Sequence, residues 1–167
     1  MKNIEIKATY PDLRKAEKIC KEIGCSFEGM LLQTDTYFHS PTGRLKLREI
    51  DGSTSQLIFY ERPDQTAAKI SKYEICLVEN PQKLKEILHL SLGVWKVVKK
   101  QRLLFLFDEV RIHLDTVEQL GCFVELEGVV TDATFETQTQ QKVAWLTKVL
   151  GVTAESLIPS SYSDLLK

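Results

Sequence analysis

Hydrophobic and polar residues alternate along much of the chain with the period of a β-strand. In residues 3–8, Asn3, Glu5 and Lys7 would share one face and the apolar residues the other. The same alternation, interrupted by turn residues, predicts further strands over residues 26–39, 44–50, 55–61, 70–78, 95–107, 109–117 and 122–131. Strands that follow one another in this way favour an antiparallel sheet or barrel with helices outside it.

Three other segments have apolar residues at helical spacing. Residues 11–23 carry such a stripe and end before a glycine. Asn80, followed by proline, predicts the start of a second helix that ends before Gly93, and Asp132 predicts the cap of a third helix near residues 133–150. Each apolar stripe needs a partner surface, and the apolar face of the sheet would provide it.

Charged residues gather on one face of strand after strand. Arg44, Lys46 and Arg48 alternate with apolar residues in one strand, and Glu125 and Glu127 do so in another. One interpretation is an ordinary half-solvated sheet, with its apolar face on the core and its charged face in water. The other is a closed barrel whose charged faces line the interior and whose apolar outer face is covered by helices.

Neighbouring like charges favour the closed barrel. Glu125 and Glu127 would repel each other unless a cation lies between them, and the three basic residues of the other strand would attract an anion. A polyphosphate that carries Mg²⁺ or Mn²⁺ satisfies both needs. Hard cations bind carboxylate and phosphate oxygens together, and Lys and Arg neutralise the remaining phosphate charge.

Composition narrows the class of protein. The chain has 167 residues, of which 43% are apolar and 27% charged, and this suits a single globular domain over residues 1–167. With 22 basic and 23 acidic residues it lacks the positive charge of a non-specific nucleic-acid binder. No stretch reads as a signal peptide or a membrane span, and the four cysteines form no CxxC pair. We therefore expect a cytoplasmic protein with reduced thiols and with no nucleic-acid or membrane partner.

Several short motifs follow one another in an order that a known family shares. They are Glu5-x-Lys7, QTDTYF (33–38), RLKLRE (44–49), LIFYERPD (57–64), Val98-x-Lys100-x-Arg102, RIHLD (111–115), LGCFVELE (120–127) and SYSDLL (161–166). Together they resemble the CYTH superfamily, also called triphosphate tunnel metalloenzymes, which includes class IV adenylate cyclases and thiamine triphosphatases. The LIFYERPD segment is similar to the cyclase-like branch. The resemblance spans nearly the whole chain.

The resemblance implies an α+β fold: a closed eight-stranded antiparallel β-barrel, or tunnel, with helices packed outside. It implies metal ligands at Glu5, Asp115, Glu125, Glu127 and, less directly, Glu74. It implies triphosphate-binding residues at Lys7, Lys46, Arg48, Lys100, Arg102 and Arg111. Glu5, Lys7 and Asp115 are the expected catalytic residues, and Mg²⁺ or Mn²⁺ is the expected cofactor.

Two positions depart from the family pattern. The first strand of the family reads Glu-x-Glu-x-Lys, and Asn3 replaces its first glutamate, which lowers the negative charge of the site. Tyr60 and Glu61 stand where some triphosphatases carry a lysine. The loss of that phosphate contact would need compensation from Arg62, Lys69 or Lys72.

The expected function is that of a metal-dependent enzyme acting on a triphosphate. By analogy with the cyclase-like branch, the reaction is conversion of ATP to cyclic AMP and pyrophosphate. Two alternatives stay open: hydrolysis of the terminal phosphate of tripolyphosphate or thiamine triphosphate, and a polyphosphate- or nucleotide-binding module with little turnover. No catalytic histidine is expected, although His113 would line the interior. The sequence leaves open the organic part of the substrate and a homodimer.

Overall fold

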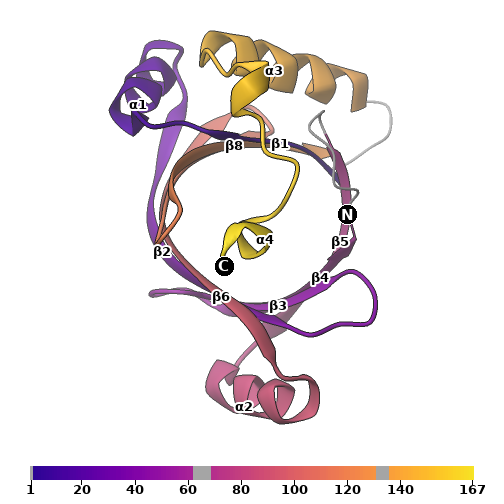
Figure 1. The fold of residues 1–167 in the computed structure, drawn as a ribbon. Coiled ribbons are helices and arrows are strands. Elements are labelled where there is room, and N and C mark those ends of the chain that lie inside the picture. Colours follow the sequence, from indigo (N-terminus) through magenta and orange to yellow (C-terminus); the bar gives the residue numbers. More distant parts are fainter. Residues whose placement is uncertain (1, 62–68, 131–135) are drawn as a thin grey trace.

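The computed structural model describes residues 2–61, 69–130 and 136–167. These residues form eight strands, β1 (Lys2–Thr9), β2 (Ser26–Phe38), β3 (Arg44–Ile50), β4 (Ser55–Glu61), β5 (Lys69–Val78), β6 (Val94–Phe107), β7 (Val110–Val117) and β8 (Gly121–Val130). All the pairings are antiparallel, in the order β1-β5-β4-β3-β2-β6-β7-β8, and β8 pairs with β1 to close the barrel (Figure 1). The predicted α+β class and the eight antiparallel strands are confirmed.

In the described part of the chain, three helices lie outside the ring of strands. They are α1 (Leu13–Glu22), α2 (Pro81–Leu92) and α3 (Glu136–Val149); α1 and α3 cover the side that β1 and β8 form, and α2 lies on the opposite side (Figure 1). The side chain of Asn80 accepts a hydrogen bond from the Lys83 amide and caps α2, as predicted. The predicted cap of α3, Asp132, lies outside the described residues. None of the described helices has the length and apolar character that a membrane crossing needs.

The main hydrophobic core lies between the outer face of the barrel and the helices. Ile4, Ile112 and Leu126 point outward from their strands and pack with Ala16 of α1 and Leu146 of α3, all of them at most 1% exposed. Because strand side chains alternate, their polar neighbours must point into the barrel. The charged faces therefore line the interior, and the half-solvated sheet is excluded.

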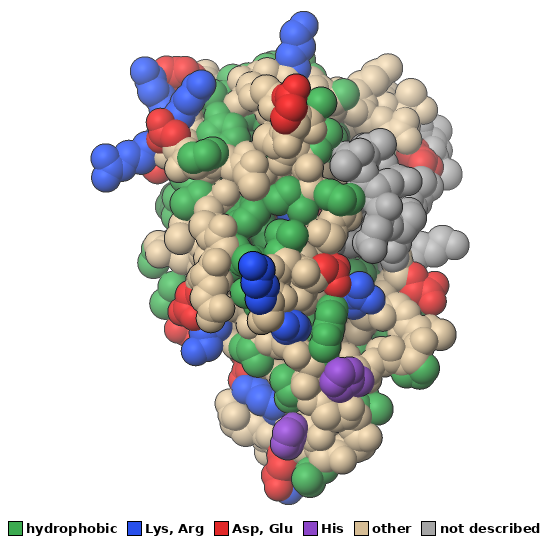
Figure 2. All heavy atoms as spheres, in the orientation of Figure 1, with side chains coloured by type: hydrophobic (Ala, Val, Ile, Leu, Met, Phe, Trp, Pro, Cys, Tyr) green, Lys and Arg blue, Asp and Glu red, His purple; other side chains and the backbone are tan. Residues whose placement is uncertain are grey.

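The C-terminal residues enter the barrel. After the short 3₁₀ helix η2 (Ala154–Ser156) the chain crosses the end of the ring and forms α4 (Tyr162–Leu165), which Figure 1 shows within the circle of strands. Tyr162 packs there with Val117 and Phe123 in a second apolar cluster. In the same view with all atoms drawn, side chains cover the centre of the ring (Figure 2). The bore beside the cluster holds a cavity.

Candidate functional site

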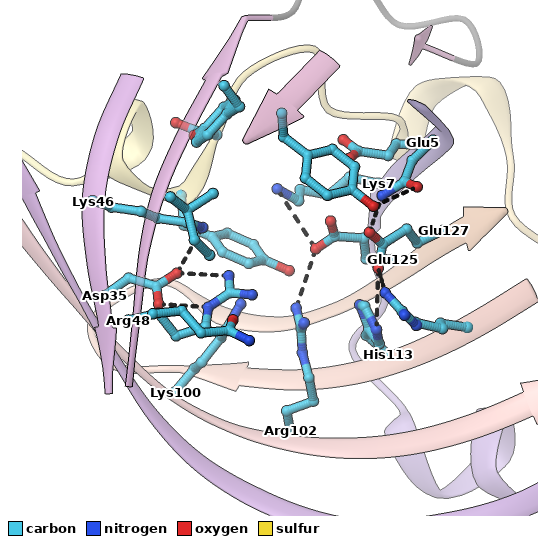
Figure 3. Close-up of a pocket in the computed structure, with 18 of the residues that line it drawn as sticks. Glu5, Lys7, Asp35, Lys46, Arg48, Lys100, Arg102, His113, Glu125 and Glu127 are labelled. Carbon is cyan, nitrogen blue, oxygen red and sulfur yellow. Dashed lines mark hydrogen bonds and ion pairs between the residues drawn. The ribbon is translucent and has the colours of Figure 1, made fainter. Parts of the chain in front are cut away.

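A cavity of about 320 Å³ lies inside the barrel, within the size range of small-molecule sites. Among the residues that the structure describes, six cationic and four anionic side chains line it, and Figure 3 shows most of them. The cationic ones are Lys7, Lys46, Arg48, Lys100, Arg102 and Arg111, and the anionic ones are Glu5, Asp35, Glu125 and Glu127. The structure thus brings together the residues that the sequence predicted for the site, with two exceptions: Asp115 and Glu74.

One side of the cavity is built around Asp35 of β2. Its carboxylate is 2% exposed and accepts hydrogen bonds from Arg48 Nε at 2.9 Å, Arg48 Nη2 at 3.0 Å and Lys46 Nζ at 2.9 Å. Gln33 Nε2 donates a further bond at 3.1 Å. The register of β2 on β3, in which Asp35 faces Arg48, places these groups together (Figure 3). Asp35 therefore orients two cations toward the cavity.

The buried lysines on this side are only partly stabilised as cations. Burial and the neighbouring Arg48 charge lower the pKa of Lys46 to about 7, although Asp35 opposes the shift. Burial and Arg102 lower the pKa of Lys100 to about 8. Burial alone would raise the pKa of the Asp35 carboxyl, but the charges of Arg48 and Lys46 hold it well below its usual value. An anion bound here would return the lysines to the charged form.

Asp115 does not line the cavity, which differs from its expected place. It is 0% exposed, and both of its oxygens accept 2.7 Å hydrogen bonds from Arg102. Lys100 Nζ lies 3.5 Å away, and the Tyr162 hydroxyl donates to Asp115 at 2.9 Å. With these partners the carboxylate is placed to fix Arg102 and Lys100, as Asp35 fixes Arg48 and Lys46. Its geometry does not favour the predicted roles of metal ligand and catalytic residue.

The opposite side of the cavity carries the glutamates of β1 and β8. Glu5 is directly opposite Glu127 in the antiparallel register, and Lys7 is opposite Glu125. Lys7 Nζ lies 3.8 Å from Glu125 Oε2, and Arg102 Nη2 donates to the same oxygen at 3.3 Å. Burial raises the pKa of the Glu125 carboxyl, but Lys7 and Arg102 lower it well below the usual value, so this glutamate is ionised.

Asn3 joins this group in place of the carboxylate that the family pattern has there. Its Nδ2 donates to Glu127 Oε1, and its Oδ1 accepts from the Tyr73 hydroxyl at 3.2 Å. Glu127 Oε2 faces Arg111 Nη1 at 3.5 Å and His113 Nε2 at 3.7 Å. Asn3 thus satisfies one oxygen of Glu127 without adding charge.

His113 lines the cavity, as the sequence predicted. It is 4% exposed, and burial together with the Arg102 charge lowers its pKa well below the usual value, which makes it a neutral imidazole. Within the described residues its Nδ1 has no hydrogen-bond partner. A buried ring nitrogen in this state is available to a polar ligand group.

Glu74 must be corrected as a candidate metal ligand. On β5 the cavity is lined by Tyr73 and Ile75, so alternation turns Glu74 to the outer face, where it is exposed. The expectation came from the family resemblance. The alternation of faces within residues 70–78 would have placed Glu74 on the opposite face of the strand from Tyr73 and Ile75.

The donor set of the acidic side suits a hard divalent cation. Glu5 and Glu127 are directly opposite each other on adjacent strands, and a pair of neighbouring carboxylates is a ligand set that hard divalent cations prefer. Among the described residues no three acidic, histidine or cysteine side chains yet converge as a metal-binding group. Glu125 and Glu127 would have to turn from their ion-pair partners, and an anionic ligand would take over those partners.

The sequence patterns did not indicate Asp35 and Tyr162 as parts of the site. Asp35 shares a strand face with Tyr37, and a lone acid on the inner face beside basic strands could have indicated an internal counterion. Tyr162 was harder to recognise, because only its position in the SYSDLL motif (161–166) suggested a role in the site. Its ring lies 3.9 Å from Lys7 Nζ and 4.9 Å from Lys100 Nζ.

Comparison with known proteins agrees with this architecture. A protein of Methanocaldococcus jannaschii named "Putative adenylate cyclase" is 26% identical over 99% of this chain and 98% of its own. A solved structure from Pyrococcus horikoshii is 24% identical, covers 99% of both chains and superposes with a TM-score of 0.85. A Hippeastrum structure is 13% identical over 98% of this chain and 92% of its own, with a TM-score of 0.65; it is described as a "Putative adenylyl cyclase" with a dominant triphosphatase activity. The model of the CYTH domain matches residues 1–162, and the chain therefore belongs to the CYTH domain family.

Proposed function

We propose that the chain is a metal-dependent enzyme that binds a triphosphate in the barrel and converts ATP to cyclic AMP and pyrophosphate. The observation that carries the proposal is the pairing, within one cavity, of a cationic side held by buried aspartates with a glutamate side on adjacent strands. Few ligands other than a metal-bound polyphosphate would satisfy both. The name of the M. jannaschii relative supports the cyclase reaction.

The cationic side would bind the phosphates. Arg48 and Arg102 are each held in place by a bidentate carboxylate, so their remaining N–H groups are preorganised toward the cavity. Lys46 and Lys100, with pKa values of about 7 and about 8, would gain charge as the phosphates approach. In this way the two arginines are already placed to neutralise charge on the phosphate oxygens, and the two lysines add to it as they take up protons.

The glutamate side would hold Mg²⁺ or Mn²⁺ through Glu5, Glu125 and Glu127. A bound divalent ion supplies Lewis-acid stabilisation of charge on phosphate oxygens. Lys7 lies between Glu125 and the Tyr162 ring, where it would contact a phosphate once Glu125 turns to the ion.

In the cyclase reaction the ribose 3′-oxygen forms a bond to the α-phosphorus, the α–β bridging bond breaks, and pyrophosphate leaves. The hydroxyl proton passes to water, because Glu5, the cavity-lining carboxylate of the expected catalytic set, would be occupied as a metal ligand. Hydrolysis of the terminal phosphate uses the same contacts with water as the nucleophile. The activity described for the Hippeastrum protein makes this the second candidate.

The test is a substrate panel of ATP, inorganic tripolyphosphate and thiamine triphosphate, each with Mg²⁺ or Mn²⁺, with cyclic AMP, pyrophosphate and phosphate as measured products. Cyclic AMP with stoichiometric pyrophosphate supports the cyclase, and phosphate alone supports the hydrolase. Glu127→Gln should abolish metal-dependent turnover, whereas the exposed Glu22→Gln should retain it. Absence of turnover and of stabilisation by tripolyphosphate with Mn²⁺ would refute the proposed function.

A further inference from the structure

The ring of Tyr162 faces two of the cations that line the cavity. It belongs to α4, which lies within the circle of strands (Figure 1). The ring centre is 3.9 Å from Lys7 Nζ and 4.9 Å from Lys100 Nζ, although β1 and β6, which carry these lysines, do not pair with each other. Both distances lie within the range of about 6 Å at which the face of an aromatic ring attracts a cation. The tyrosine is 4% exposed, so water weakens this attraction little.

The hydroxyl group of Tyr162 acts on a third cation. It donates to Asp115 Oδ2 at 2.9 Å, and the same oxygen accepts a hydrogen bond from Arg102 Nη2 at 2.7 Å. Lys100 Nζ lies 3.5 Å from this oxygen. The tyrosine therefore contacts two lysines through its ring, and through Asp115 it also supports Arg102.

Contacts on other sides fix the position of the Tyr162 ring. Phe123 of β8 packs against it, with the ring centroids 5.0 Å apart. Within α4 the Ser161 hydroxyl donates to Asp164 at 2.7 Å, and Arg44 of β3 donates to the same carboxylate at 2.9 Å. A lysine side chain, in contrast, loses considerable rotamer entropy when it is ordered. The ring is thus a fixed surface against which flexible cations can be held.

An aromatic ring orders a cation without neutralising it. The attraction comes from the negative face of a π system that carries no net charge. A carboxylate differs, because a phosphate must displace it, and Glu125, 3.8 Å from Lys7 Nζ, is such a partner. The ring contact can persist after that exchange. A side chain that is ordered before the ligand arrives costs less affinity than one that binding must immobilise.

We propose that Tyr162 is a positioning residue for phosphate binding, whose ring holds the ammonium groups of Lys7 and Lys100 in place and leaves their charge available to an anion. The inference rests on the proposed function, because it takes the triphosphate to be that anion. It requires the electrostatic character of the ring and not only its bulk, and experiment can separate the two.

The test compares Tyr162→Phe with variants in which this phenylalanine carries one, two or three ring fluorines. Fluorine withdraws negative charge from the ring face and changes the size of the ring little. Calorimetry with Mg²⁺ would measure the affinity for a methylene-bridged analogue of inorganic tripolyphosphate, which resists turnover. Tyr162→Phe should stay within about 3-fold of wild type, and the trifluorinated ring should bind about 10-fold more weakly than Tyr162→Phe. The same fluorinated series at Phe123, which packs in the same cluster, is the matched control and should change the affinity less than about 2-fold.

A second measurement uses wild type alone and does not depend on the folding of any variant. The ring current of Tyr162 should shift the NMR signals of the Lys7 ε-methylene protons upfield, and the shift should remain when the analogue binds. Loss of the shift on binding would overturn the inference, because ring and phosphate would then compete for the lysine. Equal affinities throughout the fluorinated Tyr162 series, or an equal fall in the Phe123 series, would overturn it as well. Failure of wild type to bind the analogue would instead overturn the proposed function.

Discussion

Replacement of Asp35 by asparagine tests whether the cationic side depends on its internal counterion. The substitution keeps the size of the side chain and removes its charge, while Arg48 and Lys46 remain buried beside it. Removal of one partner from a buried ion pair costs about 3–5 kcal/mol. Lys46 has a pKa of about 7 and would lose its proton in the variant, which removes one of the two uncompensated charges. We therefore expect the lower limit, about 3 kcal/mol.

For a domain of this length, a loss of about 3 kcal/mol corresponds to a fall of about 6–12 °C in the unfolding temperature. Urea unfolding at pH 7.5 would measure the free energy, and Asp51→Asn, at an exposed turn, is the matched control. Saturating tripolyphosphate should stabilise Asp35→Asn more than wild type, because the ligand supplies the missing negative charge. A loss of less than about 1 kcal/mol in the variant, or equal stabilisation of both proteins by the ligand, would contradict this expectation.

Four further predictions follow from the described contacts. Binding of tripolyphosphate raises the lowered pKa values of Lys46 and Lys100, so its affinity should fall as pH rises from 7 to 9, and binding should be accompanied by measurable proton uptake. The affinity of Lys46→Arg, whose side chain stays charged, should fall less steeply with pH. Equal slopes for the variant and wild type would contradict this prediction. The pKa values of Asp35 and Glu125 in the folded protein lie well below their unfolded values, so the stability these groups contribute is complete at neutral pH and should be lost as pH falls below about 4. If Glu125→Gln unfolded in acid with the same pH dependence as wild type, this prediction would be wrong. Asn3→Asp replaces the amide that donates to Glu127 by a carboxylate, so it should destabilise the metal-free protein by about 1 kcal/mol. The same variant should gain more thermal stability from Mn²⁺ than wild type does. Equal stabilisation of the two proteins by Mn²⁺ would argue against a metal at this position. Gly128→Ala would bring a methyl group to 2.5 Å from Thr139 Cγ2 and should cost about 1–3 kcal/mol in urea unfolding, and Thr139→Ser in the same chain should recover part of the loss.

Strand alternation predicted the inner residues well because it is a local rule. Residues such as Lys46, Arg48 and Glu127 were placed on the correct face by period 2 alone. The same rule would have excluded Glu74, which was included on resemblance and not on pattern.

Partners across the barrel were harder to predict, because they depend on register between strands distant in sequence. Asp115 looked like a free carboxylate among inner residues, and only the pairing of Arg102 with Asp115 in the register of β6 on β7 shows why both of its oxygens are occupied. Tyr162 reaches Asp115 from 47 positions away along the chain. No rule based on spacing in the sequence predicts that contact.

Asn3 and Tyr162 contribute to one cavity, although nearly the whole chain separates them. During synthesis the binding chamber therefore cannot be completed until residue 162 has left the ribosome. Until then Asp115 lacks its tyrosine partner, and Lys7 and Lys100 lack the aromatic ring. A product truncated before η2 would contain all eight strand segments but would lack Ser161 and Tyr162, so the wall of the chamber would be incomplete although every strand of the barrel is present.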